Sequence, residues 1–173
     1  GGKRSVAASE GEVFIWAIRD GSNSLRIVHP EWATALAITP NGERSVSGSN
    51  DGVIRVWRAE NGGLVREMRG HSNFVVGLAT TPDGRYLMSG SFDGTVRVWD
   101  LGDGSVVRTI DAHPGGVHDG AVSAAPSLFA TCGVDGLARV WSPPPGELVA
   151  DLAGHARARR ALAYAPGGRH LLP

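Results

Sequence analysis

A chain of 173 residues with 42% hydrophobic and 20% charged residues has the composition of a folded domain, which excludes a disordered chain. Seventeen basic and 17 acidic residues leave no net charge, so no global positive field draws the chain to nucleic acid or an anionic membrane. No apolar run approaches the ~18 residues of a membrane span, and a single cysteine, Cys132, excludes an internal disulfide. The 25 glycines and 10 prolines favour short strands joined by tight turns.

In chain order, the sequence predicts strands from alternating or β-branched runs bounded by turn residues. The first lies near Lys3 and is the second strand of a unit, and the last is another second strand that stops at Pro173. Between them we expect strands at Val53–Ala59, Leu64–Met68, Phe74–Thr80, Tyr86–Ser91, Thr95–Asp100, Val106–Ile110, Leu137–Trp141 and Leu148–Leu152. Asp93-Gly94 predicts a two-residue hairpin between the second and third strands of its unit.

A period of 42 residues organises these strands. Three kinds of residue recur at this spacing and in the same register: tryptophans, histidines and Asp-Gly pairs. We call each recurring series a ladder. The members are Trp16, Trp57, Trp99 and Trp141; His29, His71, His113 and His155; and Asp51-Gly52, Asp93-Gly94 and Asp135-Gly136, with Glu10-Gly11 as an imperfect first pair. Such a period is typical of repeat proteins, so we expect units at about 20–60, 61–102 and 103–144, with partial units at 1–19 and 145–173.

Two dipeptide signatures in these units resemble those of WD40 repeats. Gly70-His71 and Trp99-Asp100 match both signatures, whereas Trp57 is followed by Arg58 and Val28 replaces the glycine before His29. The resemblance covers essentially the whole chain and implies an all-β fold, a WD40-type β-propeller fragment of about four repeats with three complete blades. Because WD40 propellers mostly close with more blades, the resemblance further implies one part of a larger protein, with a closed four-bladed ring as the alternative.

A histidine, a hydroxyl residue, an aspartate and a tryptophan recur in each unit, which invites comparison with a hydrolase triad. The sets are His29, Ser47, Asp51 and Trp57; His71, Ser89, Asp93 and Trp99; and His113, Thr131, Asp135 and Trp141. Three equivalent active sites are not expected, and the WD40 resemblance implies instead buried hydrogen-bond networks within the blades. In the first unit Glu10 and Val6 take the aspartate and hydroxyl positions, so we expect that blade to lack the full network.

Aromatic residues gather at one end of the expected units. In a four-stranded up-and-down unit, the loop before strand one and the hairpin between strands two and three emerge at the same end. The candidate partner-binding residues there are Trp32, Asn50, Asn73, Phe74 and Phe92. Exposed aromatic residues on rigid loops anchor protein interfaces, whereas packing between blades is the alternative interpretation.

Other distinctive residues receive structural interpretations. Arg55, Arg97 and Arg139 share one repeat position, and we expect solvated or interblade arginines there. The basic cluster at residues 155–160 is interpreted as a solvated loop, with a phosphate or an acidic partner as the alternative. Cys132 is expected to be a small buried group. The Gly-rich turns lack the GxxxxGK[ST] pattern, so no nucleotide site is predicted.

The resemblance therefore implies a non-catalytic scaffold or adaptor that binds other proteins or peptides through the loop end. We expect no enzyme activity, cofactor, metal site, nucleic acid or membrane partner. The alternatives are an accessory WD40 region of a larger regulatory or enzymatic protein, or a propeller enzyme, for which His118-Asp119 is the nearest cluster outside the ladders. The single cysteine favours an intracellular, cytoplasmic protein, with the nucleus as the alternative.

Overall fold

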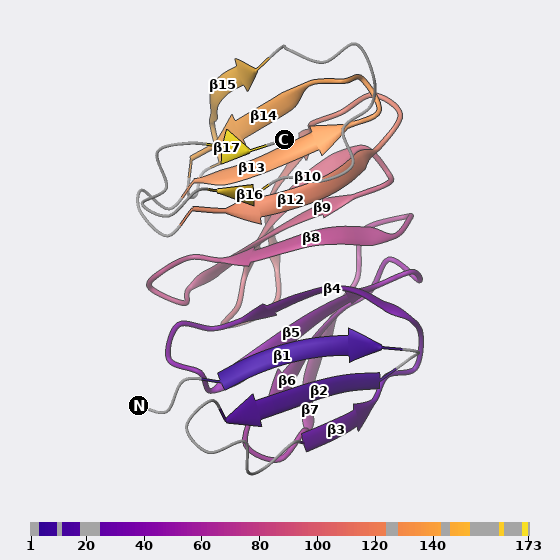
Figure 1. Cartoon of the computed structure of the whole chain (residues 1–173), viewed down its shortest axis with the longest axis vertical. Helices are drawn as coiled ribbons and strands as arrows, with labels where there is room; N and C mark the ends of the chain where they lie inside the picture. Colours follow the sequence, from indigo (N-terminus) through magenta and orange to yellow (C-terminus); the bar gives the residue numbers. More distant parts are fainter. Residues whose placement is uncertain are drawn as a thin grey trace.

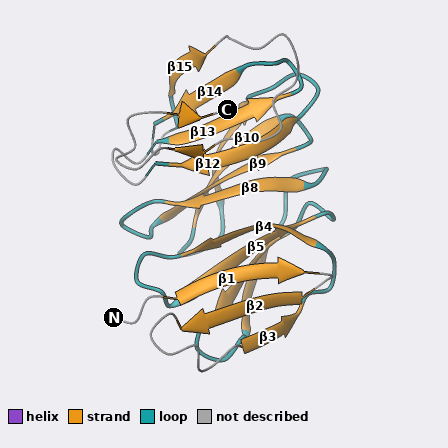
Figure 2. Ribbon diagram, viewed as in Figure 1, coloured by secondary structure: helices purple, strands orange, loops and turns teal. Residues whose placement is uncertain are grey.

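The computed structural model describes residues 4–9, 12–17, 25–123, 128–142, 146–152, 163–164 and 171–172. The regular elements in this part of the chain are β-strands, arranged in antiparallel sheets (Figure 2), so the expected all-β class is confirmed. Three sheets have four strands in sequence order, and we call each of them a blade. They consist of β4 (Ala33–Ile38), β5 (Arg44–Ser49), β6 (Ile54–Arg58) and β7 (Leu64–Met68); β8 (Val75–Thr80), β9 (Tyr86–Ser91), β10 (Thr95–Asp100) and β11 (Val106–Asp111); and β12 (Val117–Val122), β13 (Phe129–Gly133), β14 (Ala138–Trp141) and β15 (Leu148–Leu152).

Two smaller sheets flank the three blades. One contains β1 (Arg4–Ser9), β2 (Glu12–Ala17) and β3 (Leu25–Val28), and the other contains β16 (Ala163–Tyr164) and β17 (Leu171–Leu172). Neighbouring sheets meet through their first strands, since β4 contacts β8 and β8 contacts β12. The two small sheets lie towards opposite ends of the long axis (Figure 1), so the described sheets do not form a closed four-bladed ring.

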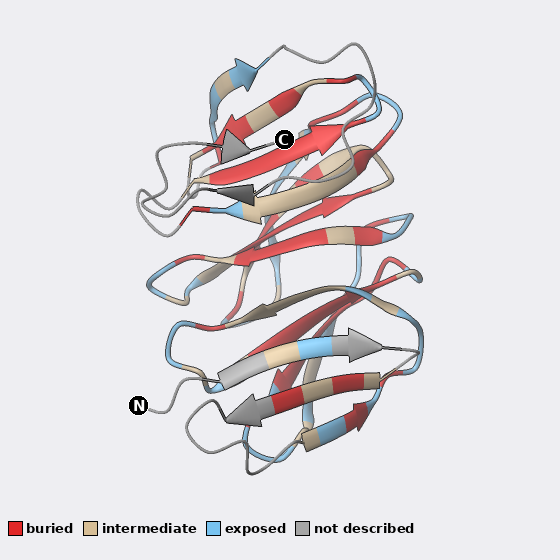
Figure 3. Cartoon of the chain, in the orientation of Figure 1, coloured by how far each residue is buried: buried red, intermediate tan, exposed pale blue. Residues whose placement is uncertain are grey.

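The core lies between the blades because side chains alternate across each strand. Trp57 and Ala59 pack against Val13, Ile15 and Ile27 of the preceding sheet. The opposite face of the β4–β7 blade carries Val46, Ile54 and Val56, which form the next cluster with Trp99 and Leu87 of the β8–β11 blade. Strands two and three of the β4–β7 and β12–β15 blades are mostly buried, and in the β8–β11 blade the first strand, β8, is mostly buried as well (Figure 3). Each ladder tryptophan with a described side chain thus fastens its blade to the one before it.

The Asp-Gly hairpins are longer than the sequence predicts. β9 ends at Ser91 and β10 begins at Thr95, so three residues join the strands and the expected two-residue loop is wrong. The turn closes through a hydrogen bond from Gly94 N–H to the carbonyl oxygen of Ser91, with Gly94 at φ 88°. A Cβ on Gly94 would lie 2.7 Å from the carbonyl oxygen of His113. The glycine is therefore required by its conformation and by the close approach of the next blade.

The strand register corrects one residue assignment in the first sheet. In the blades, the network hydroxyl lies opposite the strand-three arginine, as Ser47 lies opposite Arg55. In the first sheet Phe14 takes the arginine position and pairs with Ala7. Val6 belongs to the other face, where it packs with Val13 and Ile15. The hydroxyl position is therefore occupied by Ala7, and its assignment to Val6 is wrong by one residue because the β1–β2 hairpin is shorter than the others. Glu10 lies outside the described residues.

Candidate functional site

The polar network of the β8–β11 blade is a continuous chain of hydrogen bonds. Because an indole N–H is only a donor, Trp99 Nε1 donates to Ser89 Oγ at 2.8 Å. The Ser89 hydroxyl then donates to His71 Nε2 at 2.7 Å, and His71 Nδ1 donates to Asp93 Oδ2 at 2.8 Å. Each proton has one acceptor when His71 is neutral and protonated on Nδ1. The four residues come from the loop before β8, from β9, from the β9–β10 hairpin and from β10.

Burial and hydrogen bonding set the protonation states in this network. Burial of the imidazole lowers the pKa of His71 below its ordinary value, although Asp93 opposes that shift. Burial alone would raise the pKa of Asp93, but hydrogen bonds from Thr95 and His71 hold that pKa at about 2. At neutral pH the pair is therefore a neutral imidazole beside a carboxylate. Ser89 has no exposed surface, so its hydroxyl cannot meet a substrate and the geometry suits a structural role.

The β12–β15 blade repeats this chain with a threonine. Trp141 Nε1 donates to Thr131 Oγ1 at 2.9 Å, Thr131 Oγ1 lies 2.8 Å from His113 Nε2, and His113 Nδ1 lies 2.9 Å from Asp135 Oδ1. Asp135 also forms an ion pair with Arg139 at 2.5 Å. Burial again lowers the pKa of His113. This aspartate therefore serves both the histidine and the strand-three arginine.

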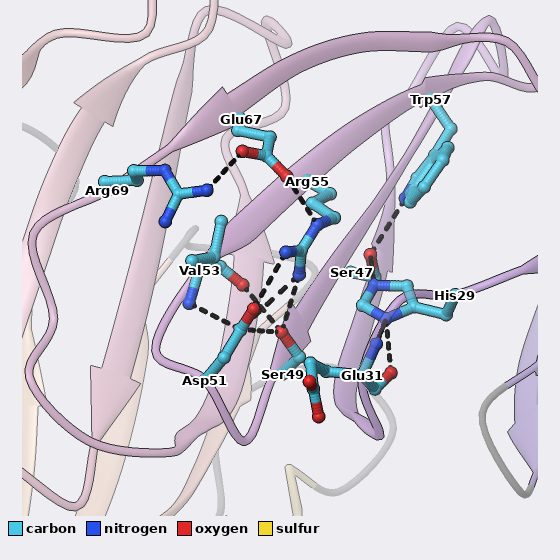
Figure 4. A network of polar contacts seen from close by, with 10 residues as sticks. All are labelled: His29, Glu31, Ser47, Ser49, Asp51, Val53, Arg55, Trp57, Glu67 and Arg69. Carbon is cyan, nitrogen blue, oxygen red and sulfur yellow. Dashed lines mark hydrogen bonds and ion pairs between the residues drawn. The ribbon is translucent and has the colours of Figure 1, made fainter.

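The β4–β7 blade brings only three of its four predicted residues together. Ser47 lies 2.8 Å from both His29 Nε2 and Trp57 Nε1. The Nδ1 of His29 instead meets the carbonyl oxygen of Glu31, and Asp51 turns away to Arg55, as Figure 4 shows. The inclusion of Asp51 in a network with His29 is therefore wrong.

Neighbouring donors distinguish the β4–β7 blade from the β8–β11 blade. In the β8–β11 blade, Ser72 N–H donates to Asp93 Oδ2, and Thr95 Oγ1 donates to Asp93 Oδ1. The corresponding residues in the β4–β7 blade are Pro30 and Val53. Pro30 has no backbone N–H, and the Val53 side chain has no hydroxyl, so both of these donors are missing. Asp51 consequently accepts from Arg55, Ser49 and the backbone of Val53. These bonds hold the pKa of Asp51 at about 2 although burial alone would raise it.

The strand-three arginines of the β4–β7 and β12–β15 blades pair with carboxylates of their own blades. Arg55 is buried, at 3% exposure, and pairs within its own blade with Asp51 at 2.8 Å and with Glu67 at 2.9 Å. Arg139 pairs in the same way with Asp135 and with Asp151. Arg55 is therefore not solvated, and a carboxylate on strand four neutralises each of the two guanidinium groups.

The loop end of the blades carries a row of aromatic residues. Trp32 is 69% exposed and Phe74 is 43% exposed. The Phe92 ring lies edge-on to Phe74, with centroids 5.9 Å apart, and to His118 of the next blade at 5.1 Å. Phe74, Phe92 and His118 therefore form a continuous strip across two blades, which we call the aromatic row.

The remaining predicted partner-binding residues flank this surface. Asn73 is exposed, and its Oδ1 accepts a hydrogen bond from the backbone N–H of Phe74. Asn50 is half-buried, and its N–H donates to the carbonyl oxygen of Trp32. Sequence reasoning missed His118 as a member of the row. His118 takes the repeat position of Thr34 and Val76, which are not aromatic, so the ladders do not mark it, although the same bulge occurs there in all three blades.

Other candidate chemistry is sparse in the described residues. They contain no group of three or more His, Cys, Asp or Glu side chains placed to hold a metal ion. No helix in this part of the chain is long and apolar enough to cross a membrane. Cys132 is completely buried on β13. The basic cluster at residues 155–160 lies outside the described ranges.

Comparison with protein families agrees with this architecture. The model of the WD domain, G-beta repeat, matches residues 22–58, 62–100 and 104–142, which together make up more than half of the chain. The chain belongs to the WD40 repeat family. The three matched segments end at or just after the third strands of the three WD40 blades, close to the ladder tryptophans.

One relative shares part of this WD40 region. The chain is 38% identical over 66 residues to the nuclear distribution protein PAC1 of Scheffersomyces stipitis. The similarity covers 35% of this chain and 12% of PAC1, so the chain matches only a small part of that protein. This likeness therefore concerns the repeats rather than a whole-protein role.

Proposed function

We propose that this WD40 chain is a non-catalytic platform that binds other proteins through the loop end of its blades. The observation that carries the proposal is the exposure of Trp32 and Phe74, with the half-buried rings of Phe92 and His118 continuing the aromatic row beside Phe74. Large aromatic side chains held on rigid loops contribute much of the binding energy in protein interfaces. WD40 domains generally bind proteins, which supports the same conclusion.

Two features of the described residues favour binding over catalysis. The recurring His, Ser or Thr, Asp and Trp groups are enclosed in hydrogen-bond networks, with His113, Ser89 and Thr131 at 1% exposure or less. His118, the candidate acid or base outside the ladders, packs edge-on against Phe92 in the aromatic row. An accessory region within a larger regulatory or enzymatic protein is compatible with this platform role. We keep an intracellular, cytoplasmic location as part of the proposal.

The proposal is tested by affinity purification from the native source, read by mass spectrometry. We expect specific partners of the unmodified chain to be lost with the double variant Trp32→Ala/Phe74→Ala. The matched control is Val107→Ala, which removes part of an exposed apolar side chain, 49% exposed, from the outer strand β11. Both variants should keep the thermal unfolding midpoint of the unmodified chain. Partners that remain bound to the double variant would show that this surface is not the binding site.

A further inference from the structure

The strand-three arginines provide an internal comparison between three equivalent positions. In two blades the arginine Nε donates to a carboxylate on strand four: Arg55 to Glu67 at 2.9 Å and Arg139 to Asp151 at 2.9 Å. Each of these arginines also pairs through a terminal nitrogen with the hairpin aspartate of its blade. Both guanidinium groups therefore have two carboxylate partners.

Arg97 has neither of these partners. The strand-four residue opposite Arg97 is Thr109, and the hairpin aspartate, Asp93, is held by His71 and Thr95. No carboxylate in the described part of the chain forms an ion pair with Arg97, and its Nε is enclosed without a hydrogen-bond partner there. Asp111, the acid two residues beyond Thr109, pairs in register with Thr95 instead.

The guanidinium of Arg97 lies beside exposed residues. Arg97 is half-buried, while Gly70 and Thr109 beside it are exposed. A Cβ on Gly70 would lie 2.5 Å from Nη1 of Arg97, so a larger residue there would displace the guanidinium. A partly buried charge without a counter-charge or complete hydrogen bonding costs free energy, and a supplied carboxylate relieves that cost.

We propose that Arg97 is a docking point for the carboxylate of an acidic side chain on a partner protein. This inference rests on the proposed binding function and names one chemical feature of the partner. A carboxylate is the expected ligand because Asp and Glu side chains occupy the equivalent place on the two sister arginines. The planar guanidinium presents paired donors that match carboxylate geometry. The partner carboxylate thus supplies, at the terminal nitrogens of Arg97, the counter-charge that Glu67 and Asp151 supply to the sister arginines.

The variant Thr109→Glu tests the idea because it builds the missing carboxylate into strand four. We would follow the Nε–Hε resonances of the three arginines by NMR in the full chain. Addition of a tetraglutamate peptide should move the Arg97 resonance and leave those of Arg55 and Arg139 in place. In Thr109→Glu the Arg97 resonance should shift before any peptide is added, and the peptide should bind at least about tenfold more weakly.

Two controls separate the specific contact from general charge. Thr109→Gln places a neutral side chain of similar size and should preserve peptide binding. Val106→Glu adds the same charge at a 39% exposed position on the same strand and should weaken binding much less than Thr109→Glu. An Arg97 resonance that is unmoved by peptide, or equal weakening by both glutamates, would overturn the proposal. Tighter binding of inorganic phosphate than of tetraglutamate would also overturn it, because the ligand would then be a phosphate.

Partner capture distinguishes this inference from the platform function. If native partners are lost with Trp32→Ala/Phe74→Ala but bind normally to Thr109→Glu, the platform stands and the Arg97 contact is rejected. If partners survive the aromatic variant but are lost with Thr109→Glu and kept with Thr109→Gln, the Arg97 contact stands and the aromatic surface is rejected.

Discussion

The β4–β7 and β8–β11 blades carry the same ladder residues but use their aspartates differently. Asp93 accepts hydrogen bonds from His71, Ser72 and Thr95, whereas Asp51 belongs to Arg55 and Ser49. The β12–β15 blade lies between these cases, because Asp135 contacts both His113 and Arg139. The same residue type at the same repeat position thus has three different sets of partners.

Neighbouring donors accompany this difference but do not decide it alone, because the β12–β15 blade has Pro114 and Leu137 at the same two positions and keeps the contact between His113 and Asp135. Where a backbone N–H and a hydroxyl hold the aspartate near the histidine, the strand-three arginine loses its local counter-charge. Where proline and valine replace those donors, the aspartate turns to the arginine. The part that does not vary is the contact of the tryptophan and histidine with the central hydroxyl, at 2.7 to 2.9 Å in all three blades.

The largest effect is expected from removing that invariant hydroxyl. Ser89→Ala leaves two buried groups, Trp99 Nε1–H and His71 Nε2, without their partner, and each unsatisfied group costs about 1–3 kcal/mol. We therefore expect the free energy of unfolding to fall by about 2–5 kcal/mol in total, measured by urea denaturation.

Ser45→Ala is the matched control for this variant. Ser45 is as completely buried as Ser89, but its hydroxyl has no hydrogen-bond partner within the described structure. Removing an unsatisfied hydroxyl should leave stability unchanged or slightly higher. Equal losses in Ser45→Ala and Ser89→Ala would mean that packing, rather than the hydrogen-bond chain, supports the blade.

An intermediate effect is expected where the two blades differ. Asp93→Asn weakens the bonds to His71, Ser72 and Thr95, which should lower the free energy of unfolding by about 1–3 kcal/mol. Asp51→Asn should cost less, because Glu67 still neutralises Arg55 and the Asp51 side chain is 26% exposed. NMR should show a perturbed His71 ring in the first variant and a nearly unchanged His29 ring in the second. A larger loss for Asp51→Asn would contradict the assignment of partners.

Much of this organisation could be predicted from the sequence because the repeat places equivalent residues in equivalent backbone positions. The strands at Tyr86–Ser91 and Thr95–Asp100 have the predicted bounds, and Ser47 and Ser89, rather than Ser49 and Ser91, contact the histidines. Periodicity also predicts that aromatic residues gather at the loop end. These features depend on strand alternation and spacing, which a sequence displays directly.

The choice between competing partners could not be predicted in the same way. Asp51 and Asp93 occupy identical ladder positions, and Pro30 and Val53 do not settle the choice, because Asp135 contacts His113 although Pro114 and Leu137 stand at the same positions. The short β1–β2 hairpin likewise changes the register by one residue without a marker in the spacing. A ladder therefore predicts which residues lie near one another better than it predicts which hydrogen bonds they form.

The smallest effect concerns a mild change of pH and tests what the three blades share. Burial lowers the pKa of His29, His71 and His113 in the folded chain, so the unfolded chain, with histidine pKa ~6.5, binds more protons as the solution becomes acidic. Their contribution is complete above about pH 6.5 and is lost as the pH falls towards the folded values. Between pH 7.5 and 6.0 the free energy of unfolding should drop by less than about 1 kcal/mol per histidine. Urea denaturation at the two pH values measures the drop, and a chain that became more stable at pH 6.0 would show that the imidazoles are charged in the folded state.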